Sequence, residues 1–333
     1  MRALKVLFIG GSGIISAHCT RRAVEAGMDV YVLNRGRNEL RPPPGSVAVL
    51  TADARNPSAV TKAIEGHVFD AVVNWVNFTP DHVQQDIEIF RNRTDQYVFI
   101  SSASAYQTPP IRLPVVESTP LRNPYWEYSR NKIACEDVLA AAYREDGFPI
   151  TIIRPSHTYD ETMIPFDGGW TVVERMRAGK PVIVPGDGTS LWTITHSKDF
   201  AEGLVGLLGK CAAAGEAFHI TGTETPSWNQ IYAQVAAAAG VPNPDLVHVA
   251  SESIAAADPV WGAALLGDKS NTMIFDNTKI RSLVPGFAPA IPFSQGARQM
   301  IAWHDEDPSR RKTDPQVDDL MDRLARAFSP RPL

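Results

Sequence analysis

Short runs of consecutive apolar residues alternate with longer amphipathic stretches over about the first 155 residues. A run that is apolar at every position is typical of a parallel strand buried on both faces. We expect such strands at residues 6–9, 30–33, 47–50, 71–73, 97–100 and 150–153. The stretches between them have helical spacing and fall at residues 14–26, 58–65, 81–90 and 124–144. This alternation predicts an α/β fold with a doubly wound parallel sheet and helices on both of its faces.

The pattern changes after Pro155. Glycine and proline become frequent between 165 and 188, a helix near 198–208 leads to a strand-like segment at 217–221, and the chain is mainly helical after 222. We therefore expect two domains. The larger comprises 1–154 with 189–222 returning to it, a smaller C-terminal domain comprises 155–188 and 223–305, and 306–333 form a charged tail.

The composition is that of an ordinary globular protein, with 44% hydrophobic and 21% charged residues in a chain of 333. A formal net charge of −5 provides no broad attraction to nucleic acid or to an anionic membrane, so we expect neither as a partner. No apolar run reaches the roughly 18 residues that a membrane span needs. The three cysteines are scattered, which is typical of reduced thiols and predicts a cytoplasmic protein. No histidine or acidic cluster has metal-ligand spacing, so we expect no metal.

A glycine-rich turn follows the first predicted strand directly. Glycines permit a tight turn and let the backbone approach a pyrophosphate, while the start of the next helix presents unpaired N–H groups. A glycine cluster is weak support alone, but a position between a strand and a helix is the context that a dinucleotide site requires. We expect the cofactor pyrophosphate to lie against Gly10, Ser12, Gly13, Ile14 and Ile15.

Polar residues follow the second and third predicted strands. Asn34, Arg35 and Arg37 stand where an NAD site commonly carries an acidic residue for the ribose hydroxyls. Arginine suits a 2′-phosphate instead, so NADP is slightly favoured over NAD, unless both arginines are only solvated surface charge. Asp53, followed by Ala54, either binds the adenine amino group or simply caps a turn.

Tyr128 and Lys132 form the most informative pair in the sequence. On a predicted helix, positions i and i+4 share one face, so both side chains reach one point. A phenol is a poor base at neutral pH, and a nearby ammonium lowers its pKa. Tyr128 can then exchange a proton with an alcohol while a hydride moves to or from a nicotinamide. Ser102, at the carboxyl end of an earlier strand, can polarise a carbonyl oxygen, and we expect these three residues to be catalytic.

These motifs resemble the extended short-chain dehydrogenase/reductase family, the group of NAD-dependent epimerases and dehydratases, over roughly residues 4–305. Gly10 and Gly13 match its glycine turn, Tyr128 and Lys132 its Y-x-x-x-K pair, and Ser102 its catalytic serine. The resemblance implies a Rossmann fold in which Lys132 also holds the nicotinamide ribose. It adds cofactor contacts at Trp75, Val76, Ser101 and Pro155, and substrate contacts at Asn77, Tyr106, His157, Trp170 and Trp192.

The sequence also departs from the family pattern. Ser16 replaces the last glycine of the turn, His157 replaces a substrate-binding asparagine, and Trp192 replaces an arginine that binds the pyrophosphate of a nucleotide sugar. These changes argue against a nucleotide-diphosphate sugar, and the lack of acidic residues at 103–105 argues against dehydration. The segment 166–170 is expected to be either a mobile substrate lip or an ordinary surface loop.

We therefore expect an NAD(P)-dependent oxidoreductase or epimerase acting on a secondary alcohol or ketone of a sugar-like substrate, with a nucleotide sugar left open and with Tyr128 as acid and base. The resemblance implies a homodimer formed through the helices near 81–95 and 124–144. Two alternatives stay open. Residues 34–36 and 196–199 are similar to the chloroplast stem-loop RNA-binding branch of the superfamily, which makes RNA binding one alternative. The other is a redox sensor that binds NAD(P) and a protein partner without chemistry.

Overall fold

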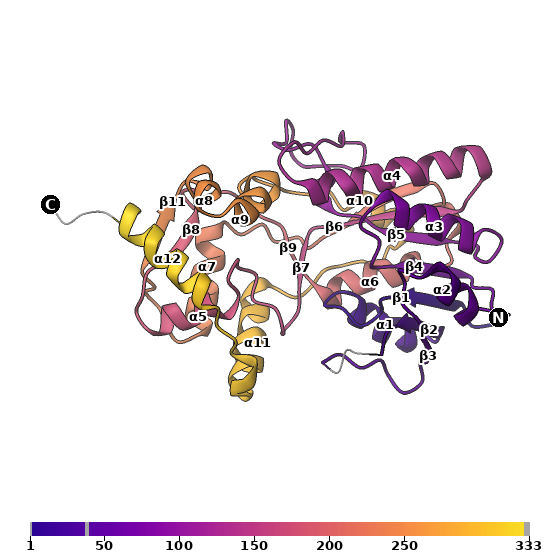
Figure 1. Ribbon diagram of the computed structural model, residues 1–333, viewed down its shortest axis with the longest axis horizontal. Coiled ribbons are helices and arrows are strands. Elements are labelled where there is room, and N and C mark those ends of the chain that lie inside the picture. The colour runs from indigo at the N-terminus through magenta and orange to yellow at the C-terminus, as the bar shows by residue number, and fades with distance from the viewer. Residues whose placement is uncertain (1, 37–39, 330–333) are drawn as a thin grey trace.

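The computed structural model describes residues 2–36 and 40–329, and its larger part is built on a seven-stranded sheet (Figure 1). The strands are β1 (Lys5–Ile9), β2 (Asp29–Asn34), β3 (Ala48–Thr51), β4 (Ala71–Asn74), β5 (Tyr97–Ile100), β6 (Ile150–Pro155) and β10 (Glu216–Ile220). Their order is β10-β6-β5-β4-β1-β2-β3, and every neighbouring pair is parallel. This arrangement confirms the predicted doubly wound parallel sheet, with the returning strand at its edge.

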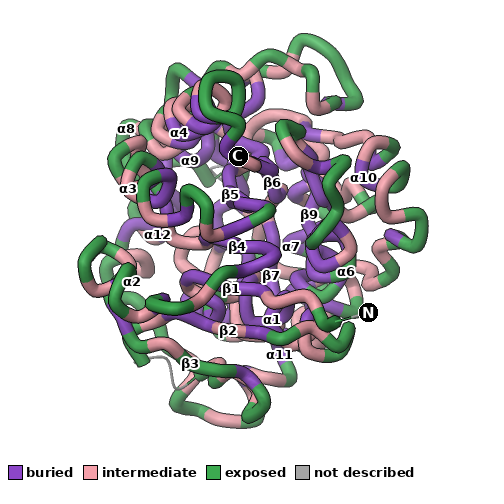
Figure 2. Tube along the Cα trace, turned by 90° about the vertical axis from the view of Figure 1, so that its right-hand side faces the viewer, coloured by how far each residue is buried: buried purple, intermediate pink, exposed green. Residues whose placement is uncertain are grey.

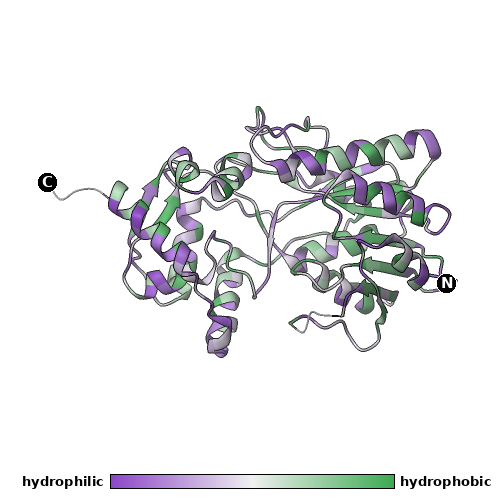
Figure 3. Cartoon of the chain, in the orientation of Figure 1, coloured by the Kyte–Doolittle hydropathy of each residue, from purple (hydrophilic) through white to green (hydrophobic). Residues whose placement is uncertain are grey.

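Helices cover both faces of this sheet because successive strand residues point to opposite sides. The helices are α1 (Ser16–Glu25), α2 (Pro57–Ala63), α3 (Pro80–Phe90), α4 (Glu127–Asp146), α6 (Ser197–Leu207) and α10 (Thr278–Leu283). In β1, Val6 and Phe8 pack with residues of α1 and α6, whereas Leu7 and Ile9 pack with residues of α2, α3 and α4. The strands other than the edge strand β3 are accordingly mostly buried in Figure 2 and hydrophobic in Figure 3, while the helices carry hydrophilic outer faces.

The order in which the chain adds strands to the sheet changes side between β1 and β4. From β1 the sheet continues through β2 and β3 to one edge, and from β4 through β5 and β6 to the other. At such a switch point the loops at the carboxyl ends of the strands separate and leave a crevice, where ligands of this class of sheet bind. The glycine turn after β1 and the loop after β4 lie at this point.

The predicted start of α4 is wrong by three residues. The side-chain oxygen of Asn123 accepts hydrogen bonds from the N–H groups of Tyr125 and Trp126, at 3.2 and 3.1 Å. Asn123 therefore closes a turn before the helix, and α4 begins at Glu127. The shift leaves Tyr128 in the first turn of the helix and Lys132 one turn later.

The smaller part of the molecule has its own hydrophobic core and lies on the left of Figure 1. Its helices are α5 (Trp170–Arg177), α7 (Trp228–Ala238), α8 (Ser251–Ala257), α9 (Pro259–Ala264), α11 (Phe293–Glu306) and α12 (Pro315–Phe328). Two strand pairs join β8 (Val182–Pro185) to β11 (Leu246–Val249) and β7 (His157–Tyr159) to β9 (Ile194–His196). Short helical turns occupy Ala103–Ala105, Cys211–Ala213, Leu265–Lys269 and Pro308–Arg310.

The C-terminal segment is not a simple charged tail, as we expected of residues 306–333. Helix α12 buries Leu320, Met321 and Leu324 against the smaller core. Charged residues alternate with these apolar residues along the sequence, so the apolar face becomes visible only when the segment is drawn as a helix. Asp318 on the same helix also accepts a hydrogen bond from the buried side chain of Arg175. No helix among the described residues is long and apolar enough to cross a membrane.

Candidate functional site

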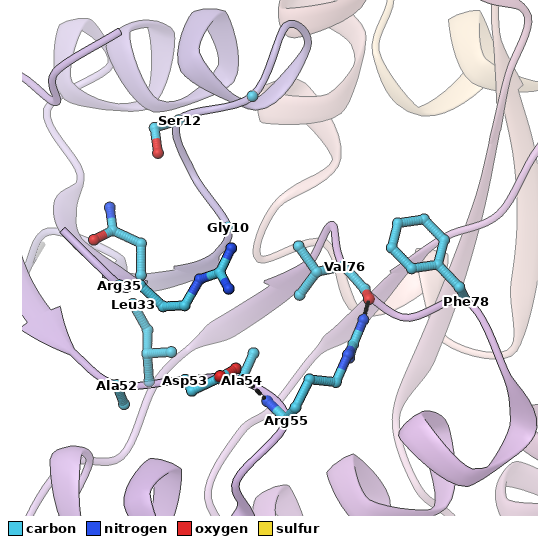
Figure 4. Close-up of a pocket in the computed structure, with 12 residues that line it drawn as sticks. Gly10, Ser12, Leu33, Arg35, Ala52, Asp53, Ala54, Arg55, Val76 and Phe78 are labelled. Atoms are coloured by element: carbon cyan, nitrogen blue, oxygen red, sulfur yellow. Dashed lines mark hydrogen bonds between the residues drawn. The ribbon is translucent and has the colours of Figure 1, made fainter. Parts of the chain in front are cut away.

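A pocket of about 540 Å³ opens at the carboxyl ends of β1, β2, β3 and β4 (Figure 4). It lies where the topology of the sheet predicts a ligand site. Eight of the residues expected to bind a dinucleotide line it, namely Gly10, Ser12, Gly13, Asn34, Arg35, Asp53, Ala54 and Val76. Leu33, Ala52, Arg55 and Phe78 complete the lining. Arg37, which we also expected here, lies outside the described residues.

The glycine turn at the head of this cofactor pocket depends on the absence of side chains. Gly10 has a φ of +88°, and a Cβ added to it would come within 2.7 Å of Cγ1 of Val76. Ser16 holds the turn by accepting a hydrogen bond from the N–H of Gly13 at 2.7 Å and donating one to the carbonyl of Gly10 at 2.8 Å. The serine that replaces the family's last glycine thus fixes the turn by hydrogen bonds.

Arg55 was missed by the sequence reasoning, although it lies only two residues after Asp53 at the same strand end. Its guanidinium donates to the carbonyl of Val76 and, at 3.4 Å, to the side-chain oxygen of Asn77. Figure 4 shows this side chain reaching from the loop after β3 to the loop after β4. It also lies over the ring of Phe78, 5.9 Å from the centroid. Arg55 therefore connects two loops in the wall of the cofactor pocket and is its second arginine beside Arg35.

The predicted catalytic residues come together at the end of β5. Tyr128 and Ser102 share a hydrogen bond and line a second pocket. The Nζ atom of Lys132 lies 5.7 Å from the ring centroid of Tyr128 and donates to the carbonyls of Asn77 and Ile100, at 2.6 and 2.8 Å. The i, i+4 spacing has thus placed phenol and ammonium on one face of α4, as expected.

The pKa of Tyr128 is not lowered, as we expected beside an ammonium, but raised. Burial raises the pKa of Tyr128 above its ordinary value of 10, and the hydrogen bond with Ser102 offsets only part of that effect. The ammonium of Lys132 is held by two carbonyl oxygens rather than by the phenol. Burial also lowers the pKa of Lys132 to about 8. Desolvation is the largest cause of the pKa shift at both groups, so Tyr128 carries its proton at neutral pH.

The second pocket has a volume of about 370 Å³ and lies between the two parts of the molecule. It adjoins the cofactor pocket at Phe78, whose ring lies 6.5 Å from that of Tyr128. Predicted residues that line it are Ile15, Ser102, Tyr128, Pro155, His157 and Trp192. Residues that the sequence reasoning missed are Ala103, Ser104, Trp126, Ser156, Thr158, Met163, Thr193, Asp268, Lys269, Met273 and Phe275.

His157 and Trp192 form one wall of this pocket. Their rings lie 4.5 Å apart, and Trp192 stacks on Trp228 at 4.7 Å. Burial lowers the pKa of His157 to about 3, so the imidazole is neutral at physiological pH. Its Nε2 atom has no hydrogen-bond partner among the described residues. This histidine is therefore a neutral polar group in the wall, with a buried nitrogen that lacks a hydrogen-bond partner among the described residues.

Two predicted substrate residues lie in the core instead of the pocket. Trp170 stacks on His304 at 4.6 Å and donates its N–H to Glu174, so it stabilises the smaller part of the molecule. Its neighbour Phe166 is buried as well, which makes 166–170 a packed segment rather than an open lip. Tyr106 is fully buried and its hydroxyl lies 3.1 Å from Nδ1 of His219. Both aromatic side chains bury a large apolar surface by packing in the core, which outweighs their position near a loop.

Several other predicted residues lie behind the pocket walls. Trp75 packs between Phe8 and Phe200. Ser101 donates its hydroxyl to Glu136 at 2.5 Å. The side chain of Asn77 donates to Asp86 at 2.7 Å, while only its carbonyl reaches Lys132. The remaining two, Lys132 and Ile14, are absent from the described linings of both pockets.

Comparisons with known proteins agree with this geometry. The profile of the NAD dependent epimerase/dehydratase family matches residues 6–221. The chain is 27% identical over 291 residues to 2'-dehydrokanamycin reductase from Streptomyces kanamyceticus, covering 85% of this chain and 80% of that protein. It is 26% identical over 256 residues to chloroplast stem-loop binding protein of 41 kDa b from Arabidopsis thaliana, covering 73% and 65% respectively.

The fold has close structural counterparts. It matches UDP-glucuronic acid 4-epimerase from Bacillus cereus, solved in complex with UDP-glucuronic acid and NAD, with a TM-score of 0.72 and 18% sequence identity. The match covers 91% of this chain and 99% of that one. At this identity the likeness concerns the fold alone, whereas the family profile spans well over half of the sequence. The chain belongs to the NAD dependent epimerase/dehydratase family.

Proposed function

We propose that this protein is an NAD(P)-dependent oxidoreductase that reduces a ketone of a sugar-like substrate to a secondary alcohol. The observation that carries this proposal is the place of Tyr128. Its hydroxyl shares a hydrogen bond with Ser102 in the second pocket, and its ring lies 6.5 Å from Phe78 in the cofactor pocket. A proton donor at the junction of a dinucleotide-sized pocket and a smaller pocket is what carbonyl reduction requires.

The described residues fit a dinucleotide. The glycine turn keeps open a space that a Cβ at Gly10 would fill, and backbone N–H groups at the start of α1 favour a pyrophosphate there. Asn34 and Arg35 border the pocket at the end of β2, where a guanidinium favours a 2′-phosphate and hence NADP over NAD. When bound, the nicotinamide of such a cofactor supplies or accepts the hydride.

The protein's own groups handle the proton. Because burial keeps Tyr128 protonated at neutral pH, its phenol can give the proton to the ketone oxygen as that oxygen gains negative charge. Ser102 donates a second hydrogen bond to the same oxygen. The ammonium of Lys132 stabilises the phenolate that remains, until water returns the proton. A protonated tyrosine is the form that reduction of a ketone requires.

The second pocket favours a sugar without a nucleotide diphosphate. Trp192 stands on its wall, and no arginine lines it among the described residues. A diphosphate would leave water there and meet only Lys269, a cation already paired with Asp167. The relative from Streptomyces kanamyceticus is named as a reductase of a dehydro-sugar compound, 2'-dehydrokanamycin, and we extend the reductase activity to this chain.

The proposal is tested by two measurements on the purified chain. In fluorescence titrations, the chain should bind NADPH more tightly than NADH. In activity assays with a panel of keto sugars, the chain should oxidise NADPH in the presence of at least one of them. Tight NADPH binding with no turnover of any keto sugar would favour the redox-sensor alternative. Failure to bind either dinucleotide, together with a salt-dependent gel shift on structured RNA, would favour the RNA-binding alternative.

A further inference from the structure

The second pocket contains a carboxylate that carbonyl reduction itself does not use. Asp268 belongs to the π-helical turn Leu265–Lys269 and lines the pocket together with Tyr128. It lies near enough to Tyr128 for its negative charge to raise the pKa of that phenol. No strand end or motif marks Asp268 in the sequence.

Asp268 has no cation of its own among the described residues. Its carboxylate accepts a hydrogen bond from the indole N–H of Trp192. The neighbouring Lys269 is directed elsewhere, because its Nζ atom lies 2.9 Å from the carboxylate of Asp167 and forms an ion pair with it. Asp268 therefore faces the pocket with one neutral donor and an unmatched negative charge.

An unmatched carboxylate in a pocket wall is unfavourable, because the wall removes water that would solvate the charge. Burial accordingly raises the pKa of Asp268 to about 6, and the positive charge of Lys269 offsets only part of that effect. A ligand with a positive charge would compensate the carboxylate for the water that it has lost. A ligand that brings an anion would add repulsion.

The other walls suit a cationic sugar ring. Trp126, Trp192 and Phe275 present aromatic surfaces, on which sugar rings and ammonium groups pack favourably. His157 is neutral and therefore adds no positive charge to the wall that would repel an ammonium group. The only cation among the described lining residues, Lys269, is already paired.

We propose that the substrate of this pocket is a sugar bearing a protonated amino group, which Asp268 binds through its carboxylate while the ketone lies at Tyr128. This inference rests on the proposed reductase function for the ketone, but the binding of the ammonium stands on the pocket alone. Asp268 is thus a specificity residue that selects amino sugars over neutral sugars and over nucleotide sugars.

The test measures equilibrium binding to the NADP-loaded chain at pH 7.5, followed by the fluorescence of the pocket tryptophans. Kanamycin and glucosamine serve as probes, each paired with its fully N-acetylated derivative, which keeps the ring and loses the charge. UDP-glucose is the anionic probe. At least one amino sugar should bind about tenfold or more tightly than its acetylated partner, and UDP-glucose should bind more weakly still.

The substitution Asp268→Asn should abolish that preference while keeping an oxygen that accepts the Trp192 N–H. The matched control is Asp319→Asn, which removes one exposed carboxylate from α12 and should leave the preference intact. NADP affinity should be unchanged in both variants. Because the comparison of amine with acetylated partner uses the wild-type chain, it decides the question even if Asp268→Asn fails to fold.

Equal binding of the amino and acetylated probes, tighter binding of UDP-glucose, or no binding of any amino sugar would overturn the inference. So would an amine preference that survives in Asp268→Asn. Failure of the reductase proposal gives a different result, in which amino sugars bind through Asp268 but no keto sugar consumes NADPH. Turnover of neutral keto sugars without amine preference would sustain the reductase and reject the amino-sugar pocket.

Discussion

At the scale of single residues, the site is governed by desolvation more than by charge pairing. Lys132 is nearly fully buried, and burial moves its pKa from 10.5 to about 8, while burial moves that of Tyr128 upward. Both groups are therefore protonated together only up to about pH 8. The proposed reaction needs both protons, one to be transferred and one to stabilise the phenolate.

The rate of ketone reduction should accordingly fall above about pH 8. Lys132 is charged below its pKa and neutral above it, so kcat/KM should decline about tenfold per pH unit on the alkaline side. A pH profile of initial NADPH consumption measures this. In Lys132→Arg, whose guanidinium stays charged, any activity that remains should extend to higher pH. A wild-type profile that stays flat to pH 10 would remove Lys132 from the proton chemistry.

Residue spacing predicted the catalytic residues but not most of the residues that shape the second pocket. Tyr128, Lys132 and Ser102 were found because helical spacing and a strand end constrain where side chains can meet. Asp268 was not found, because the turn that carries it is placed by packing of the smaller domain. Trp170 was predicted wrongly for a related reason: an aromatic side chain is equally suited to a substrate surface and to a core, and only the tertiary contacts decide.

At the scale of elements, the glycine turn joins β1 to α1 and shapes the cofactor pocket. The substitution Gly10→Ala should weaken NADPH binding by about tenfold or more, because its Cβ would meet Cγ1 of Val76 at 2.7 Å in a conformation that disfavours side chains. Calorimetric titration measures the effect. The matched control is Gly27→Ala, which has a similar φ of +77° but open space around its Cβ. Equal losses of NADPH affinity in both variants would contradict the role given to the turn.

A buried ion pair ties β6 to α4 beneath the catalytic residues. Arg154 donates to both oxygens of Glu136, at 3.0 and 2.6 Å, and both side chains are at most 6% exposed. The substitution Glu136→Gln should lower the free energy of unfolding by about 3–5 kcal/mol, because it leaves the guanidinium buried without a counter-charge. Urea denaturation measures this. A loss below about 1 kcal/mol would show that the pair contributes little to holding α4 in place.

Element prediction succeeded where short apolar runs alternate regularly with amphipathic stretches. The six strands and four helices expected in the first 155 residues all form, because a parallel sheet buried on both sides leaves a strong apolar signal. The strands β7, β8 and β9 were not predicted. The strands β7 and β9 have only three residues each, and β8 lies in a segment rich in glycine and proline, where the regular alternation of strand and helix has ended.

At the scale of the whole molecule, the C-terminal helix is part of the domain that encloses the second pocket. Met321 and Leu324 of α12 are buried in the same core as Trp192 and Trp228. The substitution Met321→Ala should lower the free energy of unfolding by about 2–5 kcal/mol through the cavity it creates. Thermal and urea unfolding measure this. The exposed neighbour Asp319→Ala should change stability by less than about 0.5 kcal/mol, and equal effects would mean that α12 is not packed as described.

The central claim is that one active site, shared between the two parts of the chain, transfers a hydride and the Tyr128 proton to a sugar ketone. It is tested most directly by supplying NADPH deuterated at C4 with a keto sugar that the chain turns over, and locating the label by mass spectrometry and NMR. We predict one deuterium on the new carbinol carbon. In Tyr128→Phe, product should form at least about 100-fold more slowly while NADPH binds as tightly as to the wild type. Product without the label, or wild-type turnover by Tyr128→Phe, would contradict the account.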